Sequence, residues 1–401
     1  MRYWAHRKVM KSFFTPTLSA ILILFAFGAF GAFLKVHYLG FTVSSDYETY
    51  IETAKVFAGE SVTQTLPNRI AVPSADLVQG GSYSGNETVA SAFGGGTDVE
   101  SVVTKAVSYR SLKPLAPLLT ALLHPVFGFE RAFWLQSLFF YFAFIVAIYL
   151  FAYEFFDDRY LAILLSLMSL LSYPVLRYGV DILTETGGWF FYALSLWLTL
   201  KFLKEPRKSF FFANVFVIVL GFLWKEYSVV AGAIFGLAIL FHQTLGWRSK
   251  AFYILGFGGL FLAVNVPWEV FIFLTYHYTY ISWYAQGGTP GFAEEFTLVN
   301  IVKSTAALLG LAWLAVPWGF RKFASLEPQK KLFLKIGLPT PFMALAWGFV
   351  SSRLFYVAAP AFLVLSVLGI KSWRRSMQIA FTVLVIAANL TWLFLSYSVK
   401  L

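Results

Sequence analysis

The chain contains no cysteine, and charged residues are scarce in it. Among its 401 residues none is Cys, only 5 are His, and Asp, Glu, Lys and Arg together make up 13%. Without cysteine, disulfides, thiolate metal sites and cysteine nucleophiles are excluded. Charged residues make up about a quarter of a typical soluble domain, so this is not the sequence of an ordinary soluble protein.

Apolar residues take the place of the missing charges. Hydrophobic residues make up 59% of the chain, aromatic residues make up 20%, and the mean hydropathy is +0.70. The sequence has long apolar runs rather than the alternating polarity of membrane-spanning strands. Since a helix needs roughly 17 to 25 mostly apolar residues to cross a bilayer, the sequence predicts an all-α polytopic membrane protein.

The apolar runs predict about eleven transmembrane helices in a single domain, residues 1–401. The basic residues before the first run, with no convincing cleavage site after it, favour a membrane anchor over a signal peptide. The predicted spans are 17–36, 131–153, 160–175, 182–203, 209–223, 227–245, 251–275, 299–319, 332–350, 354–370 and 377–397.

The positive charges are distributed unevenly over the predicted loops. The chain has 31 Lys and Arg against 20 Asp and Glu, and most of the basic residues precede the first span or fall in loops on that same side. The positive-inside rule therefore predicts a cytoplasmic N-terminus and an external C-terminus. Contact with anionic lipid headgroups explains the net charge of +11 without any nucleic acid partner. An external face without disulfides suits a prokaryotic cell membrane.

Residues 37–113 form one large predicted external loop. Its first part, 44–54, has apolar and aromatic residues at helical spacing and predicts a helix along the membrane surface. The middle, 59–100, is rich in Gly, Ser, Thr and Asn and predicts a mobile segment. The last part leads into a short apolar segment up to residue 129, which predicts a second juxtamembrane helix.

Isolated charged residues fall at the external ends of the predicted spans. Charges at a membrane boundary are costly unless they pair or line a water-filled cavity, so they are candidates for function. Together they predict an external cavity in which cations hold a phosphate and a carboxylate acts as a base. The candidates are Asp46, Glu48, Arg110, Lys113, Arg177, Asp181, Glu185, Lys225, Glu226 and Arg353.

Most candidates also have a purely structural interpretation. Ser45 and Glu48 match a capping box, in which Asp46 would only complement the helix dipole. Lys225 and Glu226 are adjacent, so they are able to neutralise each other or extend to the interface.

A second group has a structural alternative as well. Arg177, Asp181 and Glu185 are spaced four apart, and on one helix they would form an internal ladder of ion pairs. Arg353 would be a simple anchor at the end of a span, although basic anchors are uncommon on the external side, which favours function.

Four short motifs, in this order, resemble the GT-C superfamily of membrane glycosyltransferases. The first, residues 45–50 (SDYETY), places acids soon after the first span. Residues 109–117 (YRSLKPLAP) resemble the entry to the next helix. Residues 181–186 (DILTET) and 353–360 (RLFYVAAP) resemble later elements. The chain lacks the Trp-Trp-Asp-Tyr-Gly signature of oligosaccharyltransferases, and the resemblance is to the protein O-mannosyltransferase and aminoarabinose transferase branch.

The resemblance implies a reaction. A sugar would pass, with inversion, from a polyprenyl-phosphate donor to a lipid, glycan or protein acceptor on the external face. Asp46 would take the proton of the acceptor hydroxyl as general base. Arg353, with Lys225 and Arg110, would hold the lipid phosphate and stabilise the charge of the leaving group.

The resemblance also implies secondary roles for the remaining acids. Asp181 or Glu185 would orient the sugar hydroxyls or the base. Glu48 would bind a divalent cation together with Asp46 if the reaction used one, although the resemblance favours no cofactor.

Two other classes of function stay open at the sequence level. The chain would also suit a flippase or transporter of lipid-linked sugars, or a non-catalytic scaffold of envelope glycan assembly. A transporter places ionisable residues near the middle of the membrane, whereas these candidates gather at one face. That distribution favours an enzyme.

Overall fold

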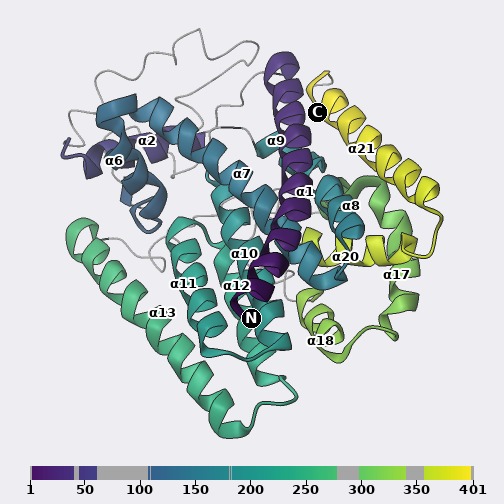
Figure 1. Ribbon diagram of the computed structural model, residues 1–401. Helices are drawn as coiled ribbons and strands as arrows, with labels where there is room; N and C mark the ends of the chain where they lie inside the picture. Colours follow the sequence, from purple (N-terminus) through teal and green to yellow (C-terminus); the bar gives the residue numbers. More distant parts are fainter. Residues whose placement is uncertain are drawn as a thin grey trace.

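In the computed structural model, the described residues form helices joined by turns and loops (Figure 1). The described residues are 2–39, 45–60, 107–108, 110–179, 181, 183–277, 298–339 and 356–398, and none of them lies in a strand. Side chains are described from residue 17 onward in the first helix and from residue 49 onward in the second. This agrees with the predicted all-α class.

Four helices are long and apolar enough to cross a membrane by length and composition. They are residues Thr17–Leu39 of α1 (Arg2–Leu39), α7 (Phe129–Phe156), α13 (Trp247–Tyr276) and residues Arg375–Ser396 of α21 (Arg375–Ser398). Each coincides with one of the eleven predicted spans. The other seven predicted spans stay a prediction, because their helices, within the described residues, are shorter or less apolar than these four.

The shorter helices fill the space between the long ones. Several predicted spans are shorter in the described structure than expected or are interrupted; the helix predicted over 227–245, for example, ends at Leu240. The segment 160–175 breaks at Leu171, and a new helix with Pro174 in its first turn begins at Tyr173. The segment 299–319 changes to a 3₁₀ helix at Gly310, which has φ +53°. The described part of 332–350 ends its helix at Gly337. The other helices are α8 (Arg159–Leu170), α9 (Tyr173–Tyr178), α10 (Glu185–Lys204), α11 (Lys208–Trp224), α12 (Tyr227–Leu240), α16 (Leu298–Leu309), η1 (Gly310–Ala315), α17 (Val316–Phe323), α18 (Pro328–Gly337), η3 (Tyr356–Ala358) and α20 (Ala359–Ile370).

The core lies around α7 and α10, which pack along one another. Phe144 of α7 and Trp189 of α10 are fully buried, with ring centroids 6.1 Å apart, and both contact the ring of Tyr356. The hydroxyl of Tyr192 donates to the carbonyl of Val357 at 2.6 Å. These contacts join η3 to the centre of the bundle.

α13 packs along one edge of the bundle and presents most of its surface outward (Figure 1). Its buried side chains, Tyr253, Asn265 and Ile272, are spaced so that they fall on one face. Apolar side chains such as Leu255 and Leu274 are exposed on the other faces. An apolar helix exposed on most sides suits contact with lipid chains.

Two further helices, α2 (Ser45–Phe57) and α6 (Leu115–Phe127), lie together at one end of the bundle (Figure 1). Both helices fall in the segments that the sequence predicts as juxtamembrane helices, and their location along the membrane surface stays a prediction. Tyr50 of α2 stacks on Phe133 of α7, with ring centroids 5.8 Å apart. Gln136 of α7 donates to the hydroxyl of Thr120 in α6 at 3.0 Å. We call this the α2 end, and the end at which α18 lies the α18 end.

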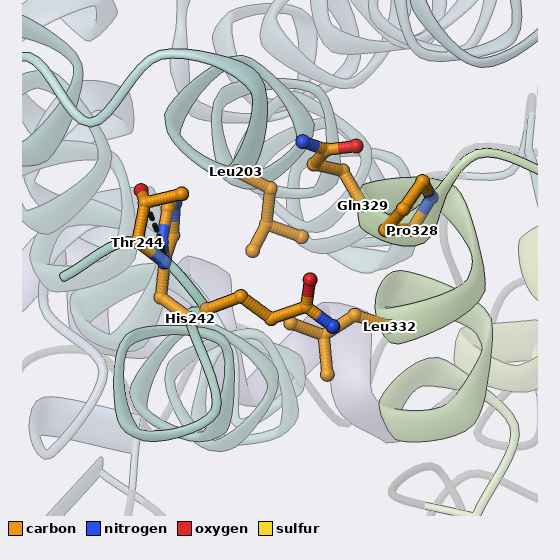
Figure 2. Close-up of a pocket in the computed structure, with 7 residues that line it drawn as sticks. Leu203, His242, Thr244, Pro328, Gln329 and Leu332 are labelled. Carbon is orange, nitrogen blue, oxygen red and sulfur yellow. Dashed lines mark hydrogen bonds between the residues drawn. The ribbon is translucent and has the colours of Figure 1, made fainter.

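The α18 end holds a network of ion pairs. Glu154 accepts from Lys201 at 2.7 Å and from Lys204 at 2.8 Å, and Asp157 accepts from Lys330 at 2.7 Å. Beside it, Figure 2 shows a small pocket between the ends of α10, α12 and α18, lined by Leu203, His242, Gln243, Thr244, Pro328, Gln329 and Leu332. This pocket lies at the opposite end of the bundle from α2.

Candidate functional site

Five of the sequence-predicted site residues meet at the α2 end. They come from three places: the segment before α6, the start of α10, and the turn between α11 and α12. The residues are Arg110, Lys113, Glu185, Lys225 and Glu226. Lys225 and Glu226 are adjacent, but the short ion-pair contact of each is with another element: Lys225 with Glu185, and Glu226 with Lys113.

Lys225 connects the α11–α12 turn to the start of α10. Its ammonium donates to the carboxylate of Glu185 at 3.0 Å and to the hydroxyl of Thr184 at 3.0 Å. The side chain of Glu185 is fully buried. Hydrogen bonds between an ammonium and a carboxylate are stronger than those between neutral groups, so this contact fixes both partners.

Two glycines at the start of α10 permit this close approach. A Cβ on Gly187 would lie 2.2 Å from Cε2 of Trp224, and one on Gly188 would lie 2.5 Å from Cδ2 of Tyr227. The indole N–H of Trp224 donates to the carbonyl of Thr184 at 2.7 Å. The turn therefore lies directly against α10, which brings Lys225 within reach of Glu185.

Lys113 lies on the other side of the same turn. Its ammonium donates to the carbonyl of Phe222 at 3.0 Å, lies 3.6 Å from the centroid of that ring, and is 3.9 Å from a carboxylate oxygen of Glu226. Burial lowers the pKa of Lys113 to about 8, with a further decrease from Lys225 and an opposing effect of Glu226 and Glu269. Lys113 therefore loses its proton more readily than an exposed lysine.

The pKa of Glu226 moves in the direction that favours its charged form. Burial raises it, but the ammonium groups of Lys113 and Lys225, a hydrogen bond from the backbone N–H of Glu226 itself and the guanidinium of Arg110 together outweigh burial and lower the pKa overall. Glu226 therefore stays ionised and holds the cations around it together.

Arg110 brings α2 into the cluster. Its Nε donates to the hydroxyl of Thr49 at 3.0 Å, and its guanidinium lies 4.6 Å from the centroid of the Tyr50 ring. The hydroxyl of Tyr50 accepts in turn from the hydroxyl of Thr184 at 3.3 Å. One continuous chain of contacts thus runs from α2 to the start of α10.

Arg177, Asp181 and Glu185 do not share one helix in the structure. The alternative prediction, in which they form a ladder of ion pairs on one helix face, is therefore wrong. α9 ends at Tyr178 and α10 begins at Glu185, so Arg177 and Asp181 lie outside α10 and the ladder does not form. Arg177 donates to the hydroxyl of Tyr173. The carboxylate of Asp181 contacts the ammonium of Lys35 instead.

The sequence reasoning missed two charged residues that act on predicted site residues, Lys35 and Glu269. Lys35 pairs with Asp181, and Glu269 of α13 acts electrostatically on Lys113. Lys35 is the one Lys or Arg in the apolar segment Thr17–Leu39, and Glu269 is the one acidic residue in the apolar segment Trp247–Tyr276. An ionisable residue inside an apolar span is the signal that would have found both.

Three predicted site residues fall outside what the structure describes. Asp46 and Glu48 belong to α2, but their side chains lie outside the described residues. Arg353 lies outside them as well, three residues before Tyr356, where the described chain resumes. Thr49 and Tyr50, which follow these two acids along α2, contact Arg110.

Groups able to hold a metal ion do not occur in the described part of the chain, where no three His, Asp or Glu side chains come together. His124 stacks on Phe129 at 4.3 Å between ring centroids. His242 faces the pocket at the α18 end. The described cluster at the α2 end is thus built from pairs of cations and carboxylates.

Comparison of the sequence with models of known protein families and with curated proteins finds no match. The chemistry of the site therefore rests on its geometry. Buried cations beside one buried and one partly exposed carboxylate, at one end of a bundle of apolar helices, are suited to bind an anionic group such as a phosphate and to orient hydroxyl groups.

Proposed function

We propose that this protein is an integral membrane glycosyltransferase that moves a sugar from a polyprenyl-phosphate donor to an acceptor at the external membrane face. The observation that carries the proposal is the meeting of Arg110, Lys113 and Lys225 with Glu185 and Glu226 at the α2 end. Three buried cations at the edge of apolar helices suit a phosphate that is attached to an apolar chain.

The location of the cluster supports a lipid-linked substrate. α6 presents apolar side chains outward next to the site, among them Leu122 and Val126. α13 does the same along the edge of the bundle. An isoprenoid chain would find apolar surface on both helices while its phosphate meets the cations.

In the proposed reaction the acceptor hydroxyl attacks the anomeric carbon of the sugar. The new bond joins the acceptor oxygen to that carbon, the bond from the carbon to the phosphate oxygen breaks, and the anomeric configuration inverts. Asp46 takes the hydroxyl proton. Arg353, Lys225 and Arg110 stabilise the negative charge that grows on the leaving phosphate.

Glu185 has a positioning role in this proposal. Its carboxylate and the hydroxyl of Thr184 fix the ammonium of Lys225. A cation that already has its final position before the substrate binds does not have to move when negative charge develops on the leaving phosphate, so it stabilises that charge at little cost.

Turnover by the purified protein tests the proposal. The protein is reconstituted in lipid with a panel of polyprenyl-phosphate sugars, and consumption of each donor is measured. We expect Asp46→Asn and Arg353→Ala each to lower turnover by about 10²-fold or more, because a general base and a phosphate ligand are removed.

The matched control for these variants is Arg207→Gln. Arg207 pairs with Glu205 on the surface at the α18 end, with both side chains more than half exposed, and such pairs contribute little to stability. Full turnover in Asp46→Asn would remove the base assignment. Donor that crosses the bilayer unconsumed would instead show a flippase.

A further inference from the structure

Lys35 and Asp181 form a buried ion pair between the first long helix and the α9–α10 connection. Both side chains are 0% exposed. Placing charges in an apolar span is costly, and a buried pair is often no more stable than two apolar side chains of similar size. Stability alone is therefore a poor explanation for this pair.

The face of α1 that carries Lys35 is packed tightly against the bundle. Gly28, Gly31 and Lys35 are spaced three and four residues apart, so they share one face. A Cβ on Gly28 would lie 2.6 Å from Cδ1 of Ile145, and one on Gly31 would lie 3.0 Å from Cδ2 of Leu171. Close packing of this face leaves the ammonium of Lys35 little freedom of position.

Asp181 lies at one end of a short connection whose other end belongs to the site. Its carbonyl accepts from the backbone N–H of Leu183 at 2.8 Å, and the carbonyl of Leu183 accepts from the hydroxyl of Ser137 at 3.0 Å. Thr184 then contacts Lys225. The connection is held by Lys35 at its start and by Lys225 at its end.

A second cation, Arg177, acts on the ion pair of Lys35 and Asp181. Arg177 is near enough to repel the ammonium of Lys35 electrostatically. Its guanidinium lies 5.7 Å from the ring centroid of Tyr173 and 5.3 Å from that of Tyr178. The attraction of the Asp181 carboxylate therefore acts against this repulsion. Loss of either partner would change the position of the connection.

We propose that Lys35 is a positioning residue for the site at the α2 end: through Asp181 it fixes the α9–α10 connection and thereby the place of Thr184, Glu185 and Lys225. The first long helix is then part of the functional apparatus as well as an anchor. The consequence for catalysis rests on the proposed function, whereas the positional effect is independent of it.

The absence of cysteine from the chain allows a direct test with single thiols in the full-length protein in lipid. Leu183→Cys reports on the connection, since Leu183 is buried. Ala238→Cys, at a fully buried position in α12, reports on general unfolding. Each is combined with Lys35→Met, and the rate of reaction with a water-soluble maleimide is measured without any substrate.

We expect Lys35→Met to raise the reactivity of Leu183→Cys by about 100-fold, because a buried charge without its partner is strongly destabilising, while Ala238→Cys stays protected. Unchanged reactivity at Leu183→Cys would overturn the inference. If both thiols react, the variant has unfolded and the double variant Lys35→Met/Asp181→Asn decides. In this double variant, a reactive Leu183→Cys beside a protected Ala238→Cys supports the inference. If both thiols are protected, or if both react, the inference is overturned.

Turnover separates positioning from stability. A positioning role predicts that Lys35→Met/Asp181→Asn regains thermal stability but keeps a lowered kcat/KM, whereas full recovery of kcat/KM would contradict it. If the wild-type protein turns over no donor, the proposed function fails, and the thiol reactivities still decide the role of Lys35.

Discussion

Single residues at the α2 end owe their properties to burial next to charges of both signs. Lys113 illustrates this, because its ammonium lies over an aromatic ring and beside a carboxylate. Burial places its pKa at about 8, below the ordinary value for lysine. A cation that loses its proton near neutral pH makes the affinity of the site for anions depend on pH.

Binding of a short isoprenyl phosphate is expected to weaken as the pH rises through about 8. The charged form of Lys113 predominates below its folded pKa and is lost above it, so the affinity falls toward a limit of about tenfold per pH unit. Titration calorimetry between about pH 7 and pH 9 measures this effect. In Lys113→Arg, which stays charged throughout this range, the affinity is expected to be flat, and an equal decrease there would contradict the assignment.

Elements meet at the site because small residues let them approach. The α11–α12 turn lies against the start of α10 at Gly187 and Gly188. The indole of Trp224 packs on Phe140 of α7, with ring centroids 4.3 Å apart, and this contact fixes the position of the turn. The geometry of Lys225 is thus decided by the packing of a neighbouring aromatic side chain.

Gly187→Ala is expected to destabilise the protein by about 1–3 kcal/mol, because its methyl group would clash with the Trp224 indole. It should also displace Lys225 from Glu185 and weaken binding of an isoprenyl phosphate. Thermal unfolding in detergent and the same calorimetry measure both effects.

Gly236→Ala provides the matched control for Gly187→Ala. Gly236 lies within α12, and a Cβ there would meet no atom within 4 Å. Stability should stay the same or rise by up to about 1 kcal/mol, because Ala favours the helix over Gly. Equal stability and equal binding in the two variants would show that contact with Trp224 does not position the turn.

The whole molecule has two chemically different ends. The α2 end holds the candidate site, and the α18 end holds the network of Lys201, Lys204 and Lys330 with Glu154 and Asp157. The chain starts at the lower end of α1 and finishes at the upper end of α21 as drawn in Figure 1. The positive-inside rule predicts that the α18 end faces the cytoplasm and the α2 end the exterior, and this orientation stays a prediction.

Labelling of single cysteines in intact cells tests this orientation. Ala58, exposed just after α2, and Ser249, exposed near the start of α13, lie at opposite ends. We expect Ala58→Cys to react with an impermeant maleimide from outside, and Ser249→Cys to react only after the membrane is opened. The reverse pattern would invert the topology and place the candidate site in the cytoplasm.

The sequence by itself determined the helical class and the charged residues worth examining. Four of its eleven predicted spans coincide with the four long apolar helices, and the other seven stay a prediction. Hydropathy and charge are properties of local sequence, so they identify helices and the ends at which charges gather. From Arg110, Lys113, Glu185, Lys225 and Glu226 one could predict a cluster. The partner of each charge could not be predicted, because pairs such as Lys225 with Glu185 join residues far apart in the chain.

Only the tertiary structure decided which elements meet. It broke the possible ladder of Arg177, Asp181 and Glu185 by ending α9 at Tyr178. It also brought Lys35 to Asp181, 146 residues further along the chain. The physical reason is that burial of charge is tolerated only where packing supplies a partner, and packing depends on every element at once, whereas hydropathy depends on a few neighbouring residues.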